Sequence, residues 1–211
     1  FHAIYNFFTV EMSAFYLDIL KDRLYCSGKN SRLRRSAQTA LFRILKDTLT
    51  LMAPILPFTT EEAWELMPAY KGKAESIHLE LFPSFKEPWL DAEALKEWAG
   101  LIELREKVLK ELEAAREKKL IGNSLEAQVR LGVPAPLVPL VQKYKGELGT
   151  LFIVSNVVVE AADGEELHIA VAKAPGNKCQ RCWNYSTTVG ASANHPDFCR
   201  RCEDVLEEIN R

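Results

Sequence analysis

Four of the five cysteines in this 211-residue chain lie within its last 33 residues, in two Cys-x-x-Cys pairs. The pairs are Cys179 with Cys182 and Cys199 with Cys202, and sixteen residues separate them. This spacing is typical of a structural zinc site, because each pair can turn two thiolates toward one ion and two pairs complete a tetrahedron. Four sulfur ligands leave no position for a reactive water. We therefore predict one structural zinc ion that stabilises a small fold and takes no part in catalysis.

Two other interpretations of the cysteines are open at this stage. The four thiols could form two disulfides, as in a secreted protein, but we expect no signal peptide here, and Cys26 is a lone cysteine far upstream. His195 lies between the pairs and could replace one ligand, although four cysteines already suffice. Zinc held by the four cysteines is our prediction.

The composition is that of a protein with an ordinary hydrophobic core, with 47% hydrophobic and 27% charged residues. The longest apolar stretch, residues 151–159, is too short to span a bilayer, so we predict no membrane segment and a cytoplasmic location. The net charge of −2 favours no partner by itself, but basic side chains cluster at residues 21–46 and 173–202. Such clusters indicate an anionic partner or, alternatively, a solvated helix face.

The first half of the chain has the spacing of helices, because apolar side chains recur every three or four positions. Pro54 and Pro57 end one of these patterns. Thr59 and Glu62 have the spacing of a capping box that opens a short helix. The predicted elements of this half are helices at residues 4–20, 33–52 and 59–66 and a crossing loop at residues 68–90.

After residue 120 the pattern changes, and β-branched residues partly alternate with others. The predicted elements are a helix at residues 91–115 with Asp91 as its cap, strands at 128–133, 151–159 and 167–174, and a short helix at 136–145. The fold class is therefore mainly α: a helical bundle, a small α+β unit and a C-terminal zinc knuckle with four cysteine ligands. The corresponding domains are residues 1–90, 91–174 and 175–211.

Nothing in the sequence has the form of an active site. It contains no nucleophile elbow, glycine-rich phosphate loop or His-Glu-x-x-His motif. The four histidines share no spacing, and the adjacent glutamate pairs would point apart on a helix. We therefore assign no catalytic residue to this chain.

A group of basic and amide side chains lies where one predicted helix ends and the next begins. These residues are Lys21, Arg23, Arg34, Arg35 and Gln38. Arginine pairs with phosphates and stacks on unpaired bases, which is how single-stranded RNA loops are held. The alternative is that some of these side chains pair with Asp18 or Asp22 inside the bundle.

Three blocks of residues resemble the anticodon-binding helical domain of bacterial isoleucyl-tRNA synthetases. The blocks are residues 13–25, 34–39 and 53–64. The loop at residues 121–127 resembles the segment after that domain's long helix, which valyl enzymes share. Residues 178–183 and 198–202 resemble the C-terminal zinc finger of the isoleucyl enzymes, whereas valyl enzymes typically end in a coiled coil. The blocks cover nearly the whole chain in the family's order.

The resemblance implies a reaction and its partners. Isoleucyl-tRNA synthetases join isoleucine to its tRNA with ATP, through an isoleucyl-adenylate, and the region resembled here binds the tRNA. The family's His-Ile-Gly-His and Lys-Met-Ser-Lys-Ser signatures, which bind ATP, are absent from this sequence, and so is its editing domain. We therefore expect a monomeric C-terminal fragment, inactive alone, whose partners are isoleucine tRNA and the remainder of the synthetase chain.

The resemblance also implies that the zinc module contacts the anticodon end of the tRNA. The candidate contacts there are Arg181, Trp183, Asn184, Arg200 and Arg201. Each has a structural alternative: the indole could pack over the knuckle, and the arginines could offset the −2 charge of four thiolates around Zn²⁺. Two other functions stay open, a non-catalytic zinc-ribbon docking module and a glycosylase-like DNA enzyme. The glycosylases need an N-terminal proline and glutamate, whereas this chain opens Phe-His-Ala.

Overall fold

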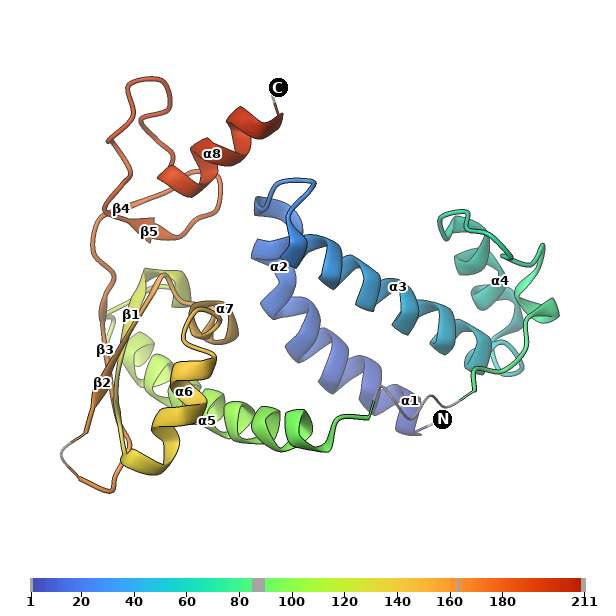
Figure 1. Cartoon of the computed structure of the whole chain (residues 1–211), viewed down its shortest axis with the longest axis horizontal. Helices are drawn as coiled ribbons and strands as arrows, with labels where there is room; N and C mark the ends of the chain where they lie inside the picture. Colours follow the sequence, from blue (N-terminus) through green and yellow to red (C-terminus); the bar gives the residue numbers. More distant parts are fainter. Residues whose placement is uncertain (1, 85–89, 163, 210–211) are drawn as a thin grey trace. The chain divides into compact units, whose positions relative to one another are not determined.

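The computed structural model describes residues 2–84, 90–162 and 164–209 and forms two compact units (Figure 1). The first unit contains residues 1–29 and 92–211, and the second contains residues 30–91. Helices predominate, with one small sheet and a C-terminal cysteine cluster, which confirms the mainly α fold class. The three predicted domains, 1–90, 91–174 and 175–211, stay a prediction.

The first unit opens with a continuous helical segment built from α1 (His2–Asn6), η1 (Phe7–Tyr16) and α2 (Leu17–Cys26). The middle stretch is π-helical, so amides there bond five residues back, as the Leu17 N–H does to the Met12 carbonyl. The apolar period predicted a helix here, but it gave no sign of the wider turn. Past Cys26 the backbone becomes extended at Ser27.

The core of the first unit lies between helix α5 (Ala92–Glu117) and strand β1 (Ala127–Val133). The helix contributes one buried stripe, made by Leu101, Leu104, Val108, Leu112 and Ala115. The strand buries every second residue, as its alternating sequence requires. Side chains of α6 (Val138–Lys143) and α7 (Leu148–Phe152) complete this core.

Strand β1 is the centre of a three-stranded sheet in the order β2-β1-β3. It pairs in parallel with β2 (Asn156–Ala161) and antiparallel with β3 (His168–Lys173). The predicted strand over residues 151–159 is wrong at its beginning, because residues 151 and 152 are the last turn of α7. A short apolar run fits a buried helix as well as a strand, and here the helix extends into it.

The first helices are joined to this core by side chains of α2 and η1. Phe15 packs against the core, with the Arg105 guanidinium 5.3 Å from its ring centroid. The Arg105 Nε–H donates to the Leu151 carbonyl at 3.0 Å. Arg23 forms an ion pair with Glu147, just before α7. These contacts explain why residues 1–29 belong to the first unit although 62 residues separate them from α5.

The second unit is a helical hairpin of α3 (Arg32–Met52) and α4 (Pro57–Leu66), followed by the short helix η2 (Ile77–Leu79). Ser31 caps α3 by accepting a hydrogen bond from the Arg34 amide. The predicted capping box at Thr59 and Glu62 is wrong, because α4 already begins at Pro57 with Leu56 as its N-cap. Proline at the first helical position lacks the amide that would otherwise need a partner.

Trp64 holds the second unit together. Its ring is fully buried among Leu49, Met67 and Ile77, and its indole N–H donates to the Ala74 carbonyl at 3.0 Å. Ala74 and Ile77 of the predicted crossing loop therefore pack against α4. Residues 85–89 of that prediction lie outside the described residues. In the described ranges, no helix is long and apolar enough to cross a membrane.

Candidate zinc knuckle and nucleic-acid surface

The four C-terminal cysteines come together in a module built from a hairpin and a helix. Strands β4 (Asn177–Lys178) and β5 (Tyr185–Ser186) carry the first pair in the turn between them. The second pair lies at the start of α8 (Arg200–Ile209). All four side chains are buried, and their sulfur atoms lie within 4.8 Å of one another.

The arrangement of the sulfurs fits a tetrahedral metal ion. A Zn–S bond of about 2.3 Å places two sulfurs of a tetrahedron about 3.8 Å apart. The Sγ atoms of Cys182 and Cys199 are 3.8 Å apart, too far for a disulfide and at the spacing that a shared zinc ion requires. All five cysteines of the chain are free thiols in the structure, so the disulfide alternative finds no support.

Polar groups around the sulfurs favour the thiolate form, which is the form that binds metal. The Cys199 amide donates to the Cys179 sulfur at 3.3 Å, and the Arg181 guanidinium to the Cys202 sulfur at 3.6 Å. A hydrogen bond from Cys202 lowers the pKa of Cys182 to about 4, whereas the same hydrogen bond raises the pKa of Cys202, and burial raises that of Cys199. These shifts come largely from the thiols acting on one another, so the Cys199 amide and the Arg181 guanidinium are groups outside the thiols that stabilise a thiolate here.

The hairpin that carries the first cysteine pair depends on Gly176, which directly precedes β4. Its φ is +87°, and a Cβ built there would lie 2.2 Å from the backbone carbonyl of Ser186 on the opposite strand. Only glycine fits this close approach. Gly190 also has a positive φ, but nothing lies within 4 Å of a Cβ at that position.

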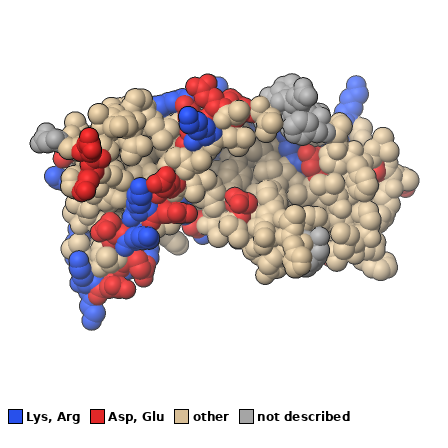
Figure 2. Space-filling view, turned by 90° about the horizontal axis from the view of Figure 1, so that it is seen from below, with Lys and Arg blue, Asp and Glu red and all other residues tan. Residues whose placement is uncertain are grey.

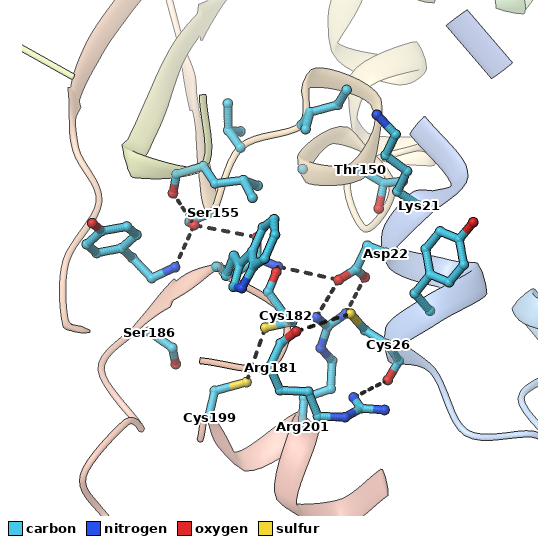
Figure 3. Close-up of a pocket in the computed structure, with 18 of the residues that line it drawn as sticks. Lys21, Asp22, Cys26, Thr150, Ser155, Arg181, Cys182, Ser186, Cys199 and Arg201 are labelled. Carbon is cyan, nitrogen blue, oxygen red and sulfur yellow. Dashed lines mark hydrogen bonds and ion pairs between the residues drawn. The ribbon is translucent and has the colours of Figure 1, made fainter. Parts of the chain in front are cut away.

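The zinc module is joined to the C-terminal end of α2 through Asp22 (Figure 3). The Asp22 carboxylate accepts two hydrogen bonds from Arg201, at 2.5 and 2.7 Å, and one from the Asn184 amide at 3.4 Å. The bidentate contact raises the pKa of Arg201. Arg201 and Asn184, both predicted to contact tRNA, are therefore engaged within the protein.

A second contact to α2 involves Arg181 and Cys26. The Arg181 guanidinium donates to the Cys26 carbonyl at 2.6 Å, while the Cys26 thiol lies 3.9 Å from the Arg181 carbonyl oxygen. Burial raises the pKa of Cys26 to about 11, so this thiol is protonated at neutral pH and is a poor metal ligand. The fifth cysteine thus packs beside the cluster and is not one of the four converging sulfurs.

Both predicted RNA contacts on α2, Lys21 and Arg23, are paired with acidic residues. Lys21 is exposed and forms an ion pair with Asp18 at 2.6 Å, which raises the pKa of the lysine. Arg23 is held by Glu147, as described above. Ion pairs also form elsewhere, as between Lys107 and Glu103 and between Lys143 and Glu97. Figure 2 shows basic and acidic side chains next to one another on the face in view. A basic run in the sequence is therefore not by itself a free cationic surface.

The remaining predicted contacts lie on α3 in the second unit and on α8. Arg35 and Gln38 are exposed on α3, and Arg34 is half-buried. Arg200 is exposed and forms an ion pair with Asp204 at 2.9 Å. The prediction that the α2 and α3 residues form one RNA-binding corner, and the tRNA-binding role of each residue, stay predictions.

Trp183 is an exposed large hydrophobic residue of the zinc module, with 60% of its surface accessible. Its amide donates to the Cys179 carbonyl at 2.9 Å, so the knuckle turn fixes its backbone, with a φ of +65°. The Lys178 ammonium lies 5.6 Å from the centre of the ring. The knuckle therefore does not bury the indole, and both its packing there and its contact with RNA stay predictions.

A cavity of about 700 Å³ lies beside the zinc module, between α2 and the end of α7 (Figure 3). It is lined by residues of all three, including Lys21, Thr150, Ser155 and Trp183. The sequence did not predict this cavity, the pairing of Asp22 with Arg201 or the pairing of Glu147 with Arg23. The two members of these ion pairs are 179 and 124 positions apart, so no local spacing could have revealed them.

Comparisons with known proteins identify the family of this chain. A model of the anticodon-binding domain of tRNA ligase matches residues 1–131, which is more than half of the chain. The chain belongs to this family. A second model, the zinc finger found in FPG and IleRS, matches residues 176–205 and thus contains all four clustered cysteines.

Curated relatives narrow the family further. An isoleucine–tRNA ligase of Syntrophotalea carbinolica is 49% identical over 217 residues, and one of Geobacter sulfurreducens is 46% identical over 216. A third, from Carboxydothermus hydrogenoformans, is 48% identical over 215 residues. These matches cover 98–99% of this chain but only 23% of each relative. The chain is thus homologous to about a quarter of an isoleucine–tRNA ligase.

Replacing Gly176 by alanine is expected to disrupt the zinc module, because the new methyl group would collide with the Ser186 carbonyl. Gly190→Ala is the matched control: it carries the same strain of about 1–2 kcal/mol at positive φ, without a collision. Competition with a colorimetric zinc chelator should show at least tenfold weaker metal binding for G176A than for G190A. Equal affinities would contradict the role assigned to Gly176.

Proposed function

We propose that this chain is the part of an isoleucine–tRNA ligase that holds the anticodon stem-loop of isoleucine tRNA. The observation that carries the proposal is the match of the anticodon-binding model to residues 1–131 together with the zinc-finger match at 176–205. The whole ligase attaches isoleucine to its tRNA with ATP. This chain contributes tRNA binding and has no catalytic residue of its own, so it does not aminoacylate alone.

Helix α3 offers the first contact surface for the RNA backbone. Arg32 and Arg35 are both exposed and lie one turn apart, on the same side of the helix, with Gln38 one further turn along. Successive turns of a helix rise about 5.4 Å, which allows neighbouring guanidinium groups to contact successive phosphates. Such contacts supply affinity and position the RNA without reading its sequence.

The zinc module offers the second contact surface through Trp183, with Lys178 beside its ring. Aromatic rings hold unpaired bases by stacking. This mode of recognition suits single-stranded RNA loops, whose bases are free to leave the stack, better than it suits RNA duplexes. The same module holds one structural zinc ion with four thiolates, and the metal acts only by fixing the turn. The protein works as a monomer in the cytoplasm, and its other partner is the remainder of the synthetase.

Zinc binding is expected to need each of the four clustered cysteines and not Cys26. Cys182→Ser removes one ligand and should lower the metal content from about one zinc per chain to well below one, with loss of the knuckle fold. Cys26→Ser is the matched control and should keep a full equivalent, because that thiol lies outside the set of converging sulfurs. Elemental analysis of both purified variants decides this. A zinc-free C26S protein would contradict the ligand assignment.

RNA binding is expected to depend on α3. The double variant R32Q/R35Q should bind isoleucine tRNA more weakly. Between about 50 and 200 mM salt, the slope of log affinity against log salt concentration should become shallower by about one for each phosphate that is no longer neutralised. The charge-matched control is K107Q/R116Q on α5, where both side chains pair with glutamates of the same helix. Filter binding over a salt series measures both.

Two outcomes of that titration would contradict the proposal. Equal losses of affinity in both double variants would show a general effect of net charge and no site on α3. Binding that does not weaken with salt would show that the chain makes no phosphate contacts.

A third result would favour the alternative function. If neither tRNA nor a stem-loop binds the chain, but the remainder of the ligase does, the chain acts as a zinc-ribbon docking module.

A further inference from the structure

Arg181 of the zinc module contacts two parts of the chain that are far apart in the sequence. Its Nη1 donates to the Cys202 sulfur at 3.6 Å and to the Cys26 carbonyl at 2.6 Å. The first acceptor is one of the four converging sulfurs. The second belongs to the last residue of α2, 155 positions before Arg181. One guanidinium thus joins the cysteine cluster to the end of a helix.

The C-terminal end of α2 is a place where a cation is stabilising. The last carbonyl groups of a helix have no amide partner within it, and the backbone is already extended at Ser27. A positive charge there also offsets the negative end of the helix dipole. Arg23, the basic residue in the last turn of α2, is paired with Glu147. Arg181 therefore supplies the charge from the zinc module and caps the helix.

The zinc module has a second contact on the same face of α2. Asp22 precedes Cys26 by four positions, which is about one helical turn. Its carboxylate accepts hydrogen bonds from Arg201, adjacent to Cys202, and from Asn184, which follows the first cysteine pair (Figure 3). Both contacts thus connect α2 to residues next to the clustered cysteines.

The contact of Arg181 with the cluster is electrostatically sensitive to metal loading. Four thiolates around Zn²⁺ carry a charge of −2, and a charge-assisted hydrogen bond is about twice as strong as a neutral one. Cys202 is fully buried, so solvent screens its contact with Arg181 only weakly. A loaded cluster therefore holds the guanidinium in the position from which it also reaches the Cys26 carbonyl.

We propose that Arg181 couples metal binding in the knuckle to the order of the C-terminal end of α2. With the cluster loaded, Arg181 caps the helix and the last turn is formed. With the cluster empty, the cap is lost and the last turn frays. Such a coupling is reciprocal, so a change that weakens the last turn must also weaken metal binding. Arg181 is a positioning residue here, and the inference does not depend on RNA binding.

The first test is amide hydrogen exchange at residues 21–26, with and without zinc. In the unmodified chain, zinc should slow exchange at these amides by about fivefold or more. In Arg181→Gln, saturated with zinc, the metal should leave these rates almost unchanged. Arg200→Gln is the matched control, because it removes the same charge from the same module at an exposed side chain that pairs with Asp204. It should keep the full zinc effect.

The second test needs no change in the zinc module, so it decides the matter even if R181Q holds no metal. Tyr25 is 77% exposed in the last turn of α2. Glycine weakens a helix relative to alanine by about fivefold in its equilibrium constant, so Y25G should bind zinc about two- to fivefold more weakly than Y25A. The same pair at Lys110, exposed on α5, should show equal affinities. Competition with a colorimetric chelator measures all four variants.

Three results would overturn the proposal. One is exchange at the end of α2 that does not change with zinc in the unmodified chain. Another is a zinc effect of equal size in R181Q and R200Q, which would show general stabilisation by the metal and no role for Arg181. The third is equal zinc affinity of Y25G and Y25A, because the coupling would then not be reciprocal.

Discussion

The convergence of four sulfur atoms is the constraint on which the C-terminal part of the structure depends. It fixes a turn that burial alone would not hold, since the module offers few apolar side chains. The same turn sets the backbone of Trp183 and so exposes the indole. Through Arg201 and Arg181 the module contacts α2. Helix α2 is in turn joined by Arg23 to Glu147, just before α7. The cysteine cluster, the helix and the exposed ring are therefore physically connected.

Those contacts change how the basic residues of the sequence are interpreted. Arg23, Arg181 and Arg201 form hydrogen bonds within the protein, and they stabilise the site that the RNA would meet. Exposed cations on α3 and the indole of Trp183 are better placed to meet a ligand. Guanidinium groups are thus of two kinds here, paired and exposed. Only the geometry distinguishes them, because a charge run in a sequence does not show which acid lies opposite.

Local patterns made much of the fold predictable. The apolar stripe of α5 and the alternation of β1 are periodic over enough residues to decide between helix and strand. The cysteine spacing likewise indicated the cluster, because each knuckle is built from neighbouring residues. Elsewhere the signal failed: Ile153 ends α7 without the glycine that would have marked the boundary, and the pairing of Asp22 with Arg201 spans 179 positions. Interactions between distant residues leave no trace in one sequence.

The most direct measurement is a filter-binding titration of the zinc-loaded chain against isoleucine tRNA and valine tRNA, repeated after metal removal by a chelator. The proposed function predicts tighter binding of isoleucine tRNA and loss of that preference without zinc, because the turn that presents Trp183 would collapse. Equal affinity for both tRNAs, or a preference that survives complete removal of the metal, would contradict the view that the zinc module takes part in anticodon recognition.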